Sequence, residues 1–413
     1  MNNEIYLVVN AGSSSLKFSA YQMPEKKELI YGYFEKIGMN DNFYSISTNG
    51  EKIKKNTYIK DHAQAVSILL NELFLNNIIT DVEEIKGVGH RVVHGGDKYS
   101  DSIIINNEVM NTIEKLVPLA PLHNPANLIG IKNIKNAIPD AVHVASFDTA
   151  FHHTIPEENY MYPIPSEWYE KYLVRKYGFH GTSYKYITNA MKYILNKKHL
   201  NLIICHIGSG ASITAIKNSK SYDTTMGMTP LDGLMMGTRC GSIDPSIISY
   251  IKKMKEQIIE ETMNDLNKKS GLLGITGKSD LRDVEALADN GDKKAQVALD
   301  MYTWKIADYI IQYYNRLEGN IDGIVFTAGV GENQSRIRDR IIKKISKVTG
   351  INIDEAKNNN IASYKEQQTG VITTEDSKIP VWVVPTNEEL MILEDTYTLT
   401  KSINEKSHTK IKR

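Results

Sequence analysis

The sequence predicts a duplicated α/β fold, because one strand-turn-strand pattern occurs twice in the chain. The first copy, residues 6–21 (YLVVNAGSSSLKFSAY), runs from an apolar strand through a small polar turn into a segment of alternating apolar and polar residues. The second copy, residues 202–216 (LIICHIGSGASITAI), repeats this order. A third apolar strand, in residues 324–333 (IVFTAGVGEN), ends in another glycine-rich turn. Internal repetition of this kind indicates two related halves.

The chemistry of the turns indicates what the fold binds. The first turn places Gly12 and three consecutive serines close to Lys17. Backbone N–H groups, hydroxyls and one ammonium can converge there on an anion such as phosphate, although the turn alone leaves an ordinary serine-rich hairpin open. None of the three turns fits GxxxxGK[ST] or GxGxxG, which excludes a P-loop and argues against a dinucleotide site. We therefore expect a nucleotide-binding fold with a phosphate-gripping turn in each half.

Composition narrows the class of protein. A length of 413 residues favours two or three domains, and the balance of 49 basic and 49 acidic residues argues against a nucleic-acid or polybasic membrane partner. Only two cysteines occur, Cys205 and Cys240, so a disulfide framework is not indicated. The N-terminus lacks a basic region with a cleavage site, and no uncharged apolar run reaches the ~20 residues that span a bilayer. These features predict a soluble, cytoplasmic enzyme.

Periodicity and helix breakers place the elements of the first half. Residues 62–76 have apolar side chains on one helical face, and Asp61 is positioned to cap that helix. Residues 85–96 read as a short strand that ends in glycines. Residues 117–125 are too rich in proline for a regular element and should form a rigid loop before a helix over residues 126–136.

The later elements follow by the same criteria. A strand is expected over residues 141–150, and residues 223–245 form a long irregular segment, which in a compact domain is usually functional. A helix over residues 295–317 has apolar positions that we expect in the core: Leu299, Met301, Trp304, Ile306 and Ile310. The last helix opens at residues 386–390 with two carboxylates, and beyond Lys401 the polar, mostly basic chain should fray.

Two residues of the first half are candidates for chemistry. Arg91 lies between apolar neighbours beside a glycine corner, where it can fork onto a carboxylate or a phosphate; a surface ion pair is the alternative. Asp148 follows a buried strand, a usual place for a carboxylate that holds a metal ion or its waters, with helix capping as the competing role. His90 and His94 are four residues apart, but without a glutamate between them in the HExxH arrangement zinc binding is improbable.

Two residues of the second half are further candidates. His180 lies between glycine and aromatic residues in YGFHGTS, and the flanking Gly178 and Gly181 allow a ligand to approach closely. A lone histidine is nevertheless more often structural than catalytic. Arg239 provides a second candidate cation within the irregular segment.

Eight motifs taken together resemble the acetate kinase family, within the superfamily of actin, sugar kinases and Hsp70 ATPase domains. In chain order they are NAGSSSLKFS, GHRVVHGG, PLAPLHNP, FDTAFH, YGFHGTS, MGMTPLDGLMMGTR, FTAGVGEN and VPTNEEL. The motifs cover nearly the entire chain and follow the family's order.

The resemblance implies a fold and an activity. The fold is a duplicated actin-like (ribonuclease H-like) ATPase fold with two domains around a cleft. The first domain comprises residues 1–149 with a returning helix at 386–400, the second comprises 150–385, and residues 401–413 form a basic flexible tail. The implied reaction is the reversible transfer of the ATP γ-phosphoryl group to acetate by direct in-line attack, which gives acetyl phosphate and ADP. Mg²⁺, or Mn²⁺ in its place, and a cytoplasmic homodimer are also implied.

The resemblance also implies nucleotide and metal contacts. Asn10 and Glu388 match the family's Mg²⁺ anchors. The positions that match its ATP contacts are Ser13, Ser15, Lys17, His206, Ile207, Gly208, Ser209, Gly210, Gly329, Val330, Gly331, Glu332 and Asn333. The run Asp280, Leu281 and Arg282 is similar to the one that flanks the adenosine.

The catalytic set is implied in the same way. Arg91 resembles the residue that binds the substrate carboxylate, Asp148 the active-site carboxylate, and His180 and Arg239 the groups that stabilise the transition state. The small apolar pocket for the acetate methyl group is matched by Val93, Leu122, Phe179 and Pro230.

The chemistry of phosphoryl transfer agrees with these roles. Negative charge spreads over three equatorial oxygens in the transition state, so catalysis consists mainly of positioning and charge neutralisation. A carboxylate nucleophile with a pKa near ~4 is already ionised at neutral pH, so no general base is needed. We therefore expect Asp148 to orient Mg²⁺ and its waters, directly or through a second shell. Because Val93 occupies space that a longer acid needs, acetate should be preferred and propionate tolerated.

Two positions depart from the family pattern, and two other functions stay open. Ser209 replaces the amide of the usual HLGNG turn, and Ser242 replaces an acidic residue of TRSGDIDP, which predicts altered nucleotide affinity or phosphoryl-donor preference. ATP remains favoured over pyrophosphate, because FTAGVGEN and the run at residues 280–282 are retained. The alternatives are a propionate or other short-chain acyl kinase and, from another class, an actin-like or chaperone-like ATPase without a small-molecule substrate.

Overall fold

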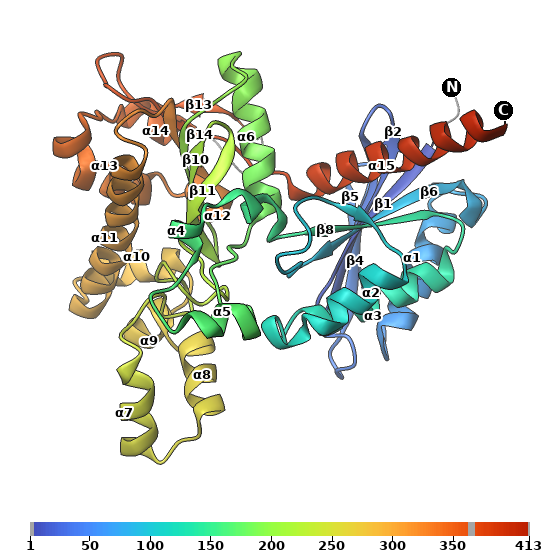
Figure 1. The fold of residues 1–413 in the computed structure, drawn as a ribbon, viewed down its shortest axis with the longest axis horizontal. Coiled ribbons are helices and arrows are strands. Elements are labelled where there is room, and N and C mark those ends of the chain that lie inside the picture. Colours follow the sequence, from blue (N-terminus) through green and yellow to red (C-terminus); the bar gives the residue numbers. More distant parts are fainter. Residues whose placement is uncertain (1–3, 362–367, 412–413) are drawn as a thin grey trace. The chain divides into compact units, whose positions relative to one another are not determined.

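The computed structural model describes residues 4–361 and 368–411. The chain divides into two compact units: Met1–Phe151 with Asn387–Arg413, and His152–Thr386. Each unit is built on its own mixed sheet with helices packed against it (Figure 1). The chain passes from the first unit to the second within the short 3-10 helix η3 (Ala150–Thr154).

The sheet of the first unit has eight strands within the described residues, in the order β5-β4-β3-β2-β1-β6-β8-β7. Strands β1 to β5 form an antiparallel meander, β6 and β8 continue the sheet in parallel with β1, and β7 pairs antiparallel with β8. Their bounds are β1 (Glu4–Ala11), β2 (Ser15–Met23), β3 (Lys27–Glu35), β4 (Phe43–Thr48), β5 (Glu51–Asn56), β6 (Ile85–Val92), β7 (Ile103–Ile104) and β8 (Val142–Phe147).

Helices cover both faces of this sheet. They are α1 (His62–Leu75), α2 (Asn107–Lys115), α3 (Asn124–Ala137) and α15 (Glu388–Ile411), with 3-10 turns η1 (Val82–Glu84) and η2 (Val117–Leu119). Leu7 and Val9 of β1 face the core that includes α1 and α3, whereas Tyr6 and Val8 face Ile392 and neighbouring residues of α15. Burial on both faces explains why β1 reads as a continuous apolar run.

The sheet of the second unit repeats the central arrangement of the first. Within the described residues its order is β11-β10-β9-β12-β14-β13. The hairpin β9–β10 is antiparallel, and β12 lies parallel to β9, as β6 lies parallel to β1. The bounds are β9 (Leu202–Ile207), β10 (Ala211–Lys217), β11 (Lys220–Thr224), β12 (Gly323–Thr327), β13 (Gly370–Val371) and β14 (Val381–Val383). The predicted duplication of the fold is therefore confirmed.

Helices α6 and α11 lie on opposite sides of this second sheet (Figure 1). The helices of the unit are α4 (Glu157–Tyr160), α5 (Ser166–Tyr172), α6 (Gly181–Leu195), α7 (Ser246–Lys255), α8 (Ile259–Lys268), α9 (Gly271–Thr276), α10 (Leu281–Asp289), α11 (Lys293–Arg316), α12 (Ala328–Asn333), α13 (Ser335–Thr349) and α14 (Glu355–Asn360). No helix in the described part of the chain is both long enough and apolar enough to cross a membrane.

Three expectations about elements differ from the structure. The proline-rich loop contains the turn η2. Helix α3 begins at Asn124, earlier than predicted, and includes Pro125 in its first turn. A proline is tolerated there, because the N–H groups of the first turn have no partner within the helix. Met301 and Trp304 of α11 are about half exposed, so they are not core residues. Helix α15 continues past Lys401, the predicted start of the tail, to Ile411, and residues 412–413 lie outside the described residues.

Candidate functional site

The β1–β2 turn of the first unit presents polar side chains on a tightly closed backbone. Gly12 N donates to the Ser15 carbonyl at 2.9 Å, and a Cβ on Gly12 would lie only 2.6 Å from Ser15 Oγ. Asn10 and Lys17 are paired across the two strands, and the side chains of Ser13 and Lys17 are exposed. The turn therefore offers an amide, hydroxyls and an ammonium to a ligand at one place.

An amide from α3 holds this turn in register with the end of β6. Asn127 Nδ2 donates to the Ala11 carbonyl at 2.8 Å, and Asn127 Oδ1 accepts from Val93 N at 3.1 Å. His62 Nε2 lies 2.8 Å from the Gly12 carbonyl and supports the turn from α1. Asn127 was not among the predicted site residues, and a single asparagine after PLHNP gives no signal of a partner so distant in sequence.

Arg91 and Asp148 form a two-pronged ion pair in the first unit. Arg91 Nε lies 3.0 Å from Asp148 Oδ1, and Nη2 lies 2.7 Å from Oδ2. The Asp148 side chain is 3% exposed and that of Arg91 is 25% exposed. Burial raises the pKa of the Asp148 carboxyl, and the guanidinium of Arg91 opposes that rise. Both ends of the Arg91 guanidinium thus bind a carboxylate of the chain itself, Asp148. That Arg91 also binds a substrate carboxylate stays a prediction.

Three side chains of the first unit, Glu388, Asp148 and Asn10, carry the kind of oxygen donor that Mg²⁺ prefers. Glu388, the first residue of α15, is close enough to raise the pKa of both Arg91 and Asp148 by its charge. Among the described residues no three histidine, cysteine, aspartate or glutamate side chains gather into a metal site. Mg²⁺ in kinases is usually held by one or two carboxylates together with substrate phosphates, so Glu388, Asp148 and the amide of Asn10 suit it.

In the second unit, His180 and Arg239 converge on the β9–β10 turn. A Cβ on Gly210 would lie 3.5 Å from Arg239 Nη1 and 3.6 Å from His180 Nε2. His180 precedes α6 with φ 57°, and its ring stacks on that of His206 with centroids 4.1 Å apart. Within the described residues Arg239 forms no ion pair; its Nη1 donates to the Pro230 carbonyl at 3.2 Å. A cation without a carboxylate partner beside an imidazole suits an anionic ligand.

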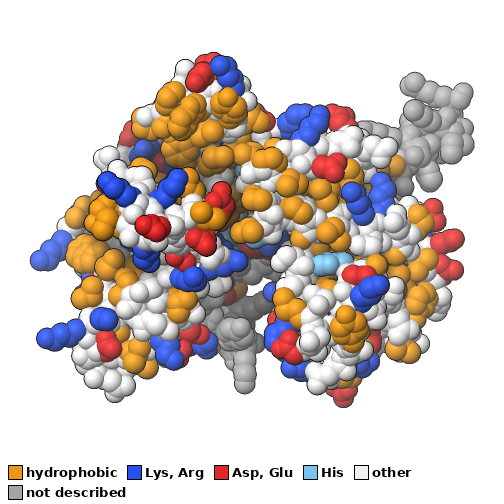
Figure 2. All heavy atoms as spheres, turned by 90° about the horizontal axis from the view of Figure 1, so that it is seen from below, with side chains coloured by type: hydrophobic (Ala, Val, Ile, Leu, Met, Phe, Trp, Pro, Cys, Tyr) orange, Lys and Arg blue, Asp and Glu red, His pale blue; other side chains and the backbone are white. Residues whose placement is uncertain are grey.

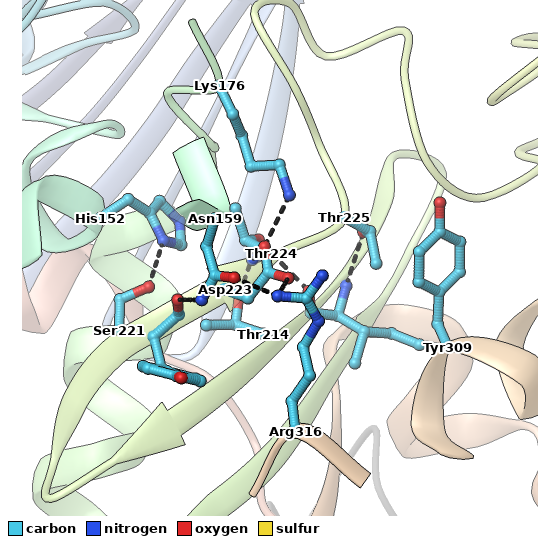
Figure 3. Close-up of polar contacts among 12 residues, drawn as sticks. His152, Asn159, Lys176, Thr214, Ser221, Asp223, Thr224, Thr225, Tyr309 and Arg316 are labelled. Carbon is cyan, nitrogen blue, oxygen red and sulfur yellow. Dashed lines mark hydrogen bonds and ion pairs between the residues drawn. The ribbon is translucent and has the colours of Figure 1, made fainter. Parts of the chain in front are cut away.

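Strand β11 anchors the residues that precede His180, and Figure 3 shows its Asp223 and Ser221 with their partners Lys176 and His152. Buried Asp223 lies between Lys176 Nζ, at 2.6 Å, and Arg316 Nη1, at 3.4 Å. His152 joins Ser221 Oγ to the Phe179 carbonyl, with 2.8 Å at each ring nitrogen.

Gly178 allows this segment to pack closely. Its φ is +78°, and a Cβ there would lie 2.5 Å from Thr224 Cγ2 and 2.8 Å from the His152 ring. Only glycine fits that backbone and that space. Residues 176–179, held by these contacts, therefore fix the position of His180 and the start of α6. The contacts of His152 and Asp223 were not predicted from the sequence.

A cavity of about 300 Å³ lies in the second unit, near the lower end of the size range of small-molecule sites. The predicted nucleotide residues that line it are Gly208, Ser209, Asp280, Leu281, Arg282, Gly329, Val330 and Asn333. Tyr302 and Leu272, which were not predicted, also line the wall. The carboxylate of Asp280 pairs with Arg282 and caps α10, and this pairing lowers the pKa of Asp280 to about 2. Three segments predicted to bind the nucleotide, at residues 208–209, 280–282 and 329–333, thus contribute to the wall of one cavity.

Some predicted nucleotide residues lie outside the cavity lining. The side chain of Ile207 is core, and Gly331 is buried within α12. The Glu332 carboxylate accepts from Ala328 N at 2.7 Å and from Thr386 N at 3.1 Å, so it holds the chain's own backbone. His206 Nδ1 lies 2.8 Å from Ser183 Oγ, which in turn lies 2.8 Å from Thr386 Oγ1.

The four residues predicted to bind the acetate methyl group belong to different units. Val93 is 7% exposed and Leu122 is 60% exposed, both in the first unit. Phe179 is buried and Pro230 is half-buried in the second unit. Their shared role stays a prediction.

Comparison with known proteins settles the family. The sequence model of the Acetokinase family matches residues 5–394. The chain belongs to the acetokinase family. It is 49% identical over 396 residues to an acetate kinase of Bacillus cytotoxicus, covering 95% of this chain and 98% of the relative. The family resemblance recognised in the sequence is therefore confirmed.

Two solved kinase structures resemble the fold over nearly its whole length. The crystal structure of Porphyromonas gingivalis acetate kinase has a TM-score of 0.89 at 41% identity, covering 96% of this chain and 99% of that one. A propionate kinase from Francisella tularensis has a TM-score of 0.90 at 40% identity, with the same coverage. The predicted fold class is confirmed by this likeness.

Proposed function

We propose that this chain is an acetate kinase that reversibly transfers the γ-phosphoryl group of ATP to acetate and gives acetyl phosphate and ADP. The observation that carries the proposal lies in the second unit. There, Arg239 and His180 converge on Gly210, next to Gly208 and Ser209 in the wall of a nucleoside-sized cavity. The relative from Bacillus cytotoxicus, with which the chain aligns over 95% of its length, is named an acetate kinase.

The proposed chemistry is charge neutralisation during direct in-line attack. The acetate carboxylate, ionised at neutral pH, is the nucleophile, so the chain needs no residue to remove a proton. Arg239 would neutralise charge on the equatorial oxygens of the moving phosphoryl group, and His180 would donate a hydrogen bond to them. Arg91 would bind the acetate carboxylate through donor positions that its pair with Asp148 does not use, since a guanidinium has five N–H groups.

Mg²⁺ would be held in the first unit by Glu388 and Asn10, with Mn²⁺ as a substitute. When bound, the ion supplies positive charge to the phosphate oxygens of ATP. Asp148 already accepts two hydrogen bonds from Arg91, so its remaining lone pairs favour contact with the waters of the ion. The exposed Lys17 and the hydroxyls of the β1–β2 turn would bind phosphate oxygens.

A trapping assay tests the proposal against an ATPase of another class. Purified protein with ATP, MgCl₂ and acetate should form acetyl phosphate, which hydroxylamine converts to a coloured hydroxamate. Hydrolysis of ATP without hydroxamate would contradict the proposal and favour an actin-like or chaperone-like ATPase.

A propionate kinase is the second candidate, because the propionate kinase of Francisella tularensis matches this fold as well as an acetate kinase does. The same assay with acetate, propionate and butyrate distinguishes the two. Acetate should have the highest kcat/KM, since buried Val93 would limit the length of the acid. A higher value for propionate would favour the second candidate.

We also propose that the protein is a homodimer in the cytoplasm. Helices α7 and α8 carry exposed apolar side chains, including Ile247, Tyr250, Met254 and Ile259. Figure 2, seen from the side on which these helices project in Figure 1, shows hydrophobic patches at the surface. Exposed apolar area of this kind favours contact with a second copy. Light scattering after size-exclusion chromatography should give twice the chain mass, and Tyr250→Glu should lower it.

A further inference from the structure

A buried chain of hydroxyl groups contacts the ring of His180 from the side away from the Gly210 turn. His180 Nδ1 lies 2.8 Å from Ser212 Oγ, and Ser212 Oγ lies 2.6 Å from the hydroxyl of Tyr184. Neither Ser212 nor Tyr184 is exposed to solvent. The other ring nitrogen, Nε2, is the one close to Gly210 and Arg239. Ser212 therefore contacts only the nitrogen of His180 that lies away from this turn.

The order of donors along this chain follows from acidity. A phenol is a stronger acid than an aliphatic alcohol, so the Tyr184 hydroxyl is the better donor and Ser212 Oγ the better acceptor. Burial raises the pKa of Tyr184, which keeps its hydrogen in place. The Tyr184 hydroxyl also has Thr214 and the backbone of His206 as hydrogen-bond partners, and Thr214 Oγ1 lies 2.8 Å from Thr224 Oγ1. Either oxygen of the Ser212–Tyr184 pair can donate; on the acidity argument Tyr184 donates, and the serine hydrogen is then directed to its other neighbour, His180 Nδ1.

We propose that Ser212, oriented by Tyr184, is a positioning residue that fixes the tautomer of His180. Ser212 Oγ–H donates to Nδ1, so the hydrogen of the neutral imidazole resides on Nε2. His180 then presents an N–H to the phosphoryl group without a net charge of its own. In the opposite tautomer a lone pair on Nε2 would face the anion and repel it. The inference rests on the proposed function for its kinetic consequence, but the tautomer itself can be observed without turnover.

The groups that face His180 support a neutral donor. His206 stacks on the ring, Arg239 Nη1 lies on the same side of Gly210 as His180 Nε2, and Tyr184 reaches the ring through Ser212. The guanidinium of Arg239 disfavours a second positive charge at Nε2. With the tautomer fixed, Nε2–H donates a hydrogen bond without adding a positive charge. Hydrogen bonds to the other ring nitrogen fix the tautomer of histidines in other active sites in the same way.

The first test reads the tautomer directly. Long-range ¹H–¹⁵N correlation spectra of the full chain, labelled at histidine and assigned with His180→Asn, distinguish Nδ1 from Nε2 protonation. Wild-type protein near pH 8 should show the hydrogen of His180 on Nε2, and Ser212→Ala should show a mixture of tautomers. A hydrogen on Nδ1 in the wild-type protein would overturn the proposal, whether or not the protein phosphorylates acetate.

The second test measures kinetics. Ser212→Ala should lower kcat by roughly tenfold, the factor that one net hydrogen bond is worth, and leave the KM for acetate and for ATP unchanged. Ser212→Thr restores a hydroxyl and should recover kcat. Tyr184→Phe should show a smaller loss than Ser212→Ala.

Thr188→Val is the matched control. Thr188 lies on α6 like Tyr184, is buried, and its hydroxyl has no hydrogen-bond partner among the described residues. This variant should keep both the tautomer and kcat, and thermal melting of every variant checks the fold. A loss of kcat in Ser212→Ala with an unchanged spectrum would refute the role of Ser212. Wild-type protein that forms no acetyl hydroxamate would instead refute the proposed function and leave the spectral test in force.

Discussion

The substitution Asp148→Asn removes the charge of a buried ion pair while almost preserving its shape. In the wild-type protein the carboxylate accepts two hydrogen bonds from Arg91, at 3.0 Å and 2.7 Å. The asparagine variant keeps one acceptor and turns an N–H group towards the guanidinium. Arg91 then retains Glu388 as the nearby negative charge.

The cost can be estimated from burial. Removing one partner of a buried pair costs about 3–5 kcal/mol. We expect a value of ~3 kcal/mol, near the lower end, because Arg91 is 25% exposed and water solvates part of its charge. For a unit of this size the loss corresponds to a melting temperature lower by roughly 6–12 °C. The catalytic loss should be about 10²- to 10³-fold in kcat, as for other removed electrostatic groups.

Thermal melting and the hydroxamate assay measure the two effects on the same samples. Asp41→Asn is the control, because Asp41 pairs with Lys36 at the surface of the same unit, where ion pairs contribute little. It should melt and turn over like the wild-type protein. Asp148→Asn with wild-type melting would show that the pair is not structural. Near-normal turnover with unchanged Mg²⁺ dependence would show that Asp148 does not orient the ion.

Three further predictions concern the acid, the phosphoryl donor and pH. Val93→Ala should raise the propionate-to-acetate ratio of kcat/KM by about tenfold, since one methylene is worth ~1–3 kcal/mol; an unchanged ratio would show that Val93 does not limit the acid. Ser209→Asn should change the KM for ATP, because Ser209 lines the cavity; identical kinetics with every donor would remove that role. Burial lowers the pKa of His90 and His143. As the pH falls, these histidines therefore take up protons in the unfolded chain before they do so in the folded protein. The free energy of unfolding should decrease below about pH 6.5, by up to ~1.4 kcal/mol per pH unit for each histidine. His143→Gln should reduce the slope of melting temperature against pH, and an equal slope would exclude this histidine pair as its source.

Local signals predicted most of the fold. The helix that starts at His62 is capped as expected, with Asp61 Oδ1 accepting from Gln64 N at 2.9 Å. The irregular segment after β11 is also confirmed, because the next regular element, α7, begins at Ser246. Caps, turns and apolar runs involve residues close together in the sequence, so their physical cause is visible there.

Side-chain direction on long helices was predicted less well. The buried stripe of α11 follows Leu299, Thr303, Ile306 and Ile310, and Met301 falls on another face. Trp304 is also off this stripe, and Lys344 Nζ lies 4.4 Å from the centre of its ring. Apolar type alone therefore overestimated the core, because a helix this long has room for apolar residues on its exposed side.

Contacts between distant polar residues could not be predicted. Ser242, noted in the sequence only as the loss of an acid, donates to Asp232 Oδ1 at 2.6 Å and accepts from Gly233 N at 3.0 Å. An aspartate at this position would place two carboxylates side by side, so the serine fits its neighbour in this chain. The sequence around Ser242 does not indicate that Asp232 is its partner, because only the fold brings the two side chains together.

The β1–β2 and β9–β10 turns, which we predict to bind phosphate, share a construction that explains why such contacts matter. Small residues make a turn narrow enough for its backbone to approach an anion, but they provide few side chains to hold it in place. In each unit a helix that packs beside the turn provides that support. Asn127 in the first turn of α3 holds Ala11, and Ser183 in the first turn of α6 holds the ring of His206. Residues outside the glycine and serine motifs therefore determine the geometry of the motifs, and substitutions at Asn127 or Ser183 should affect nucleotide binding without touching the nucleotide.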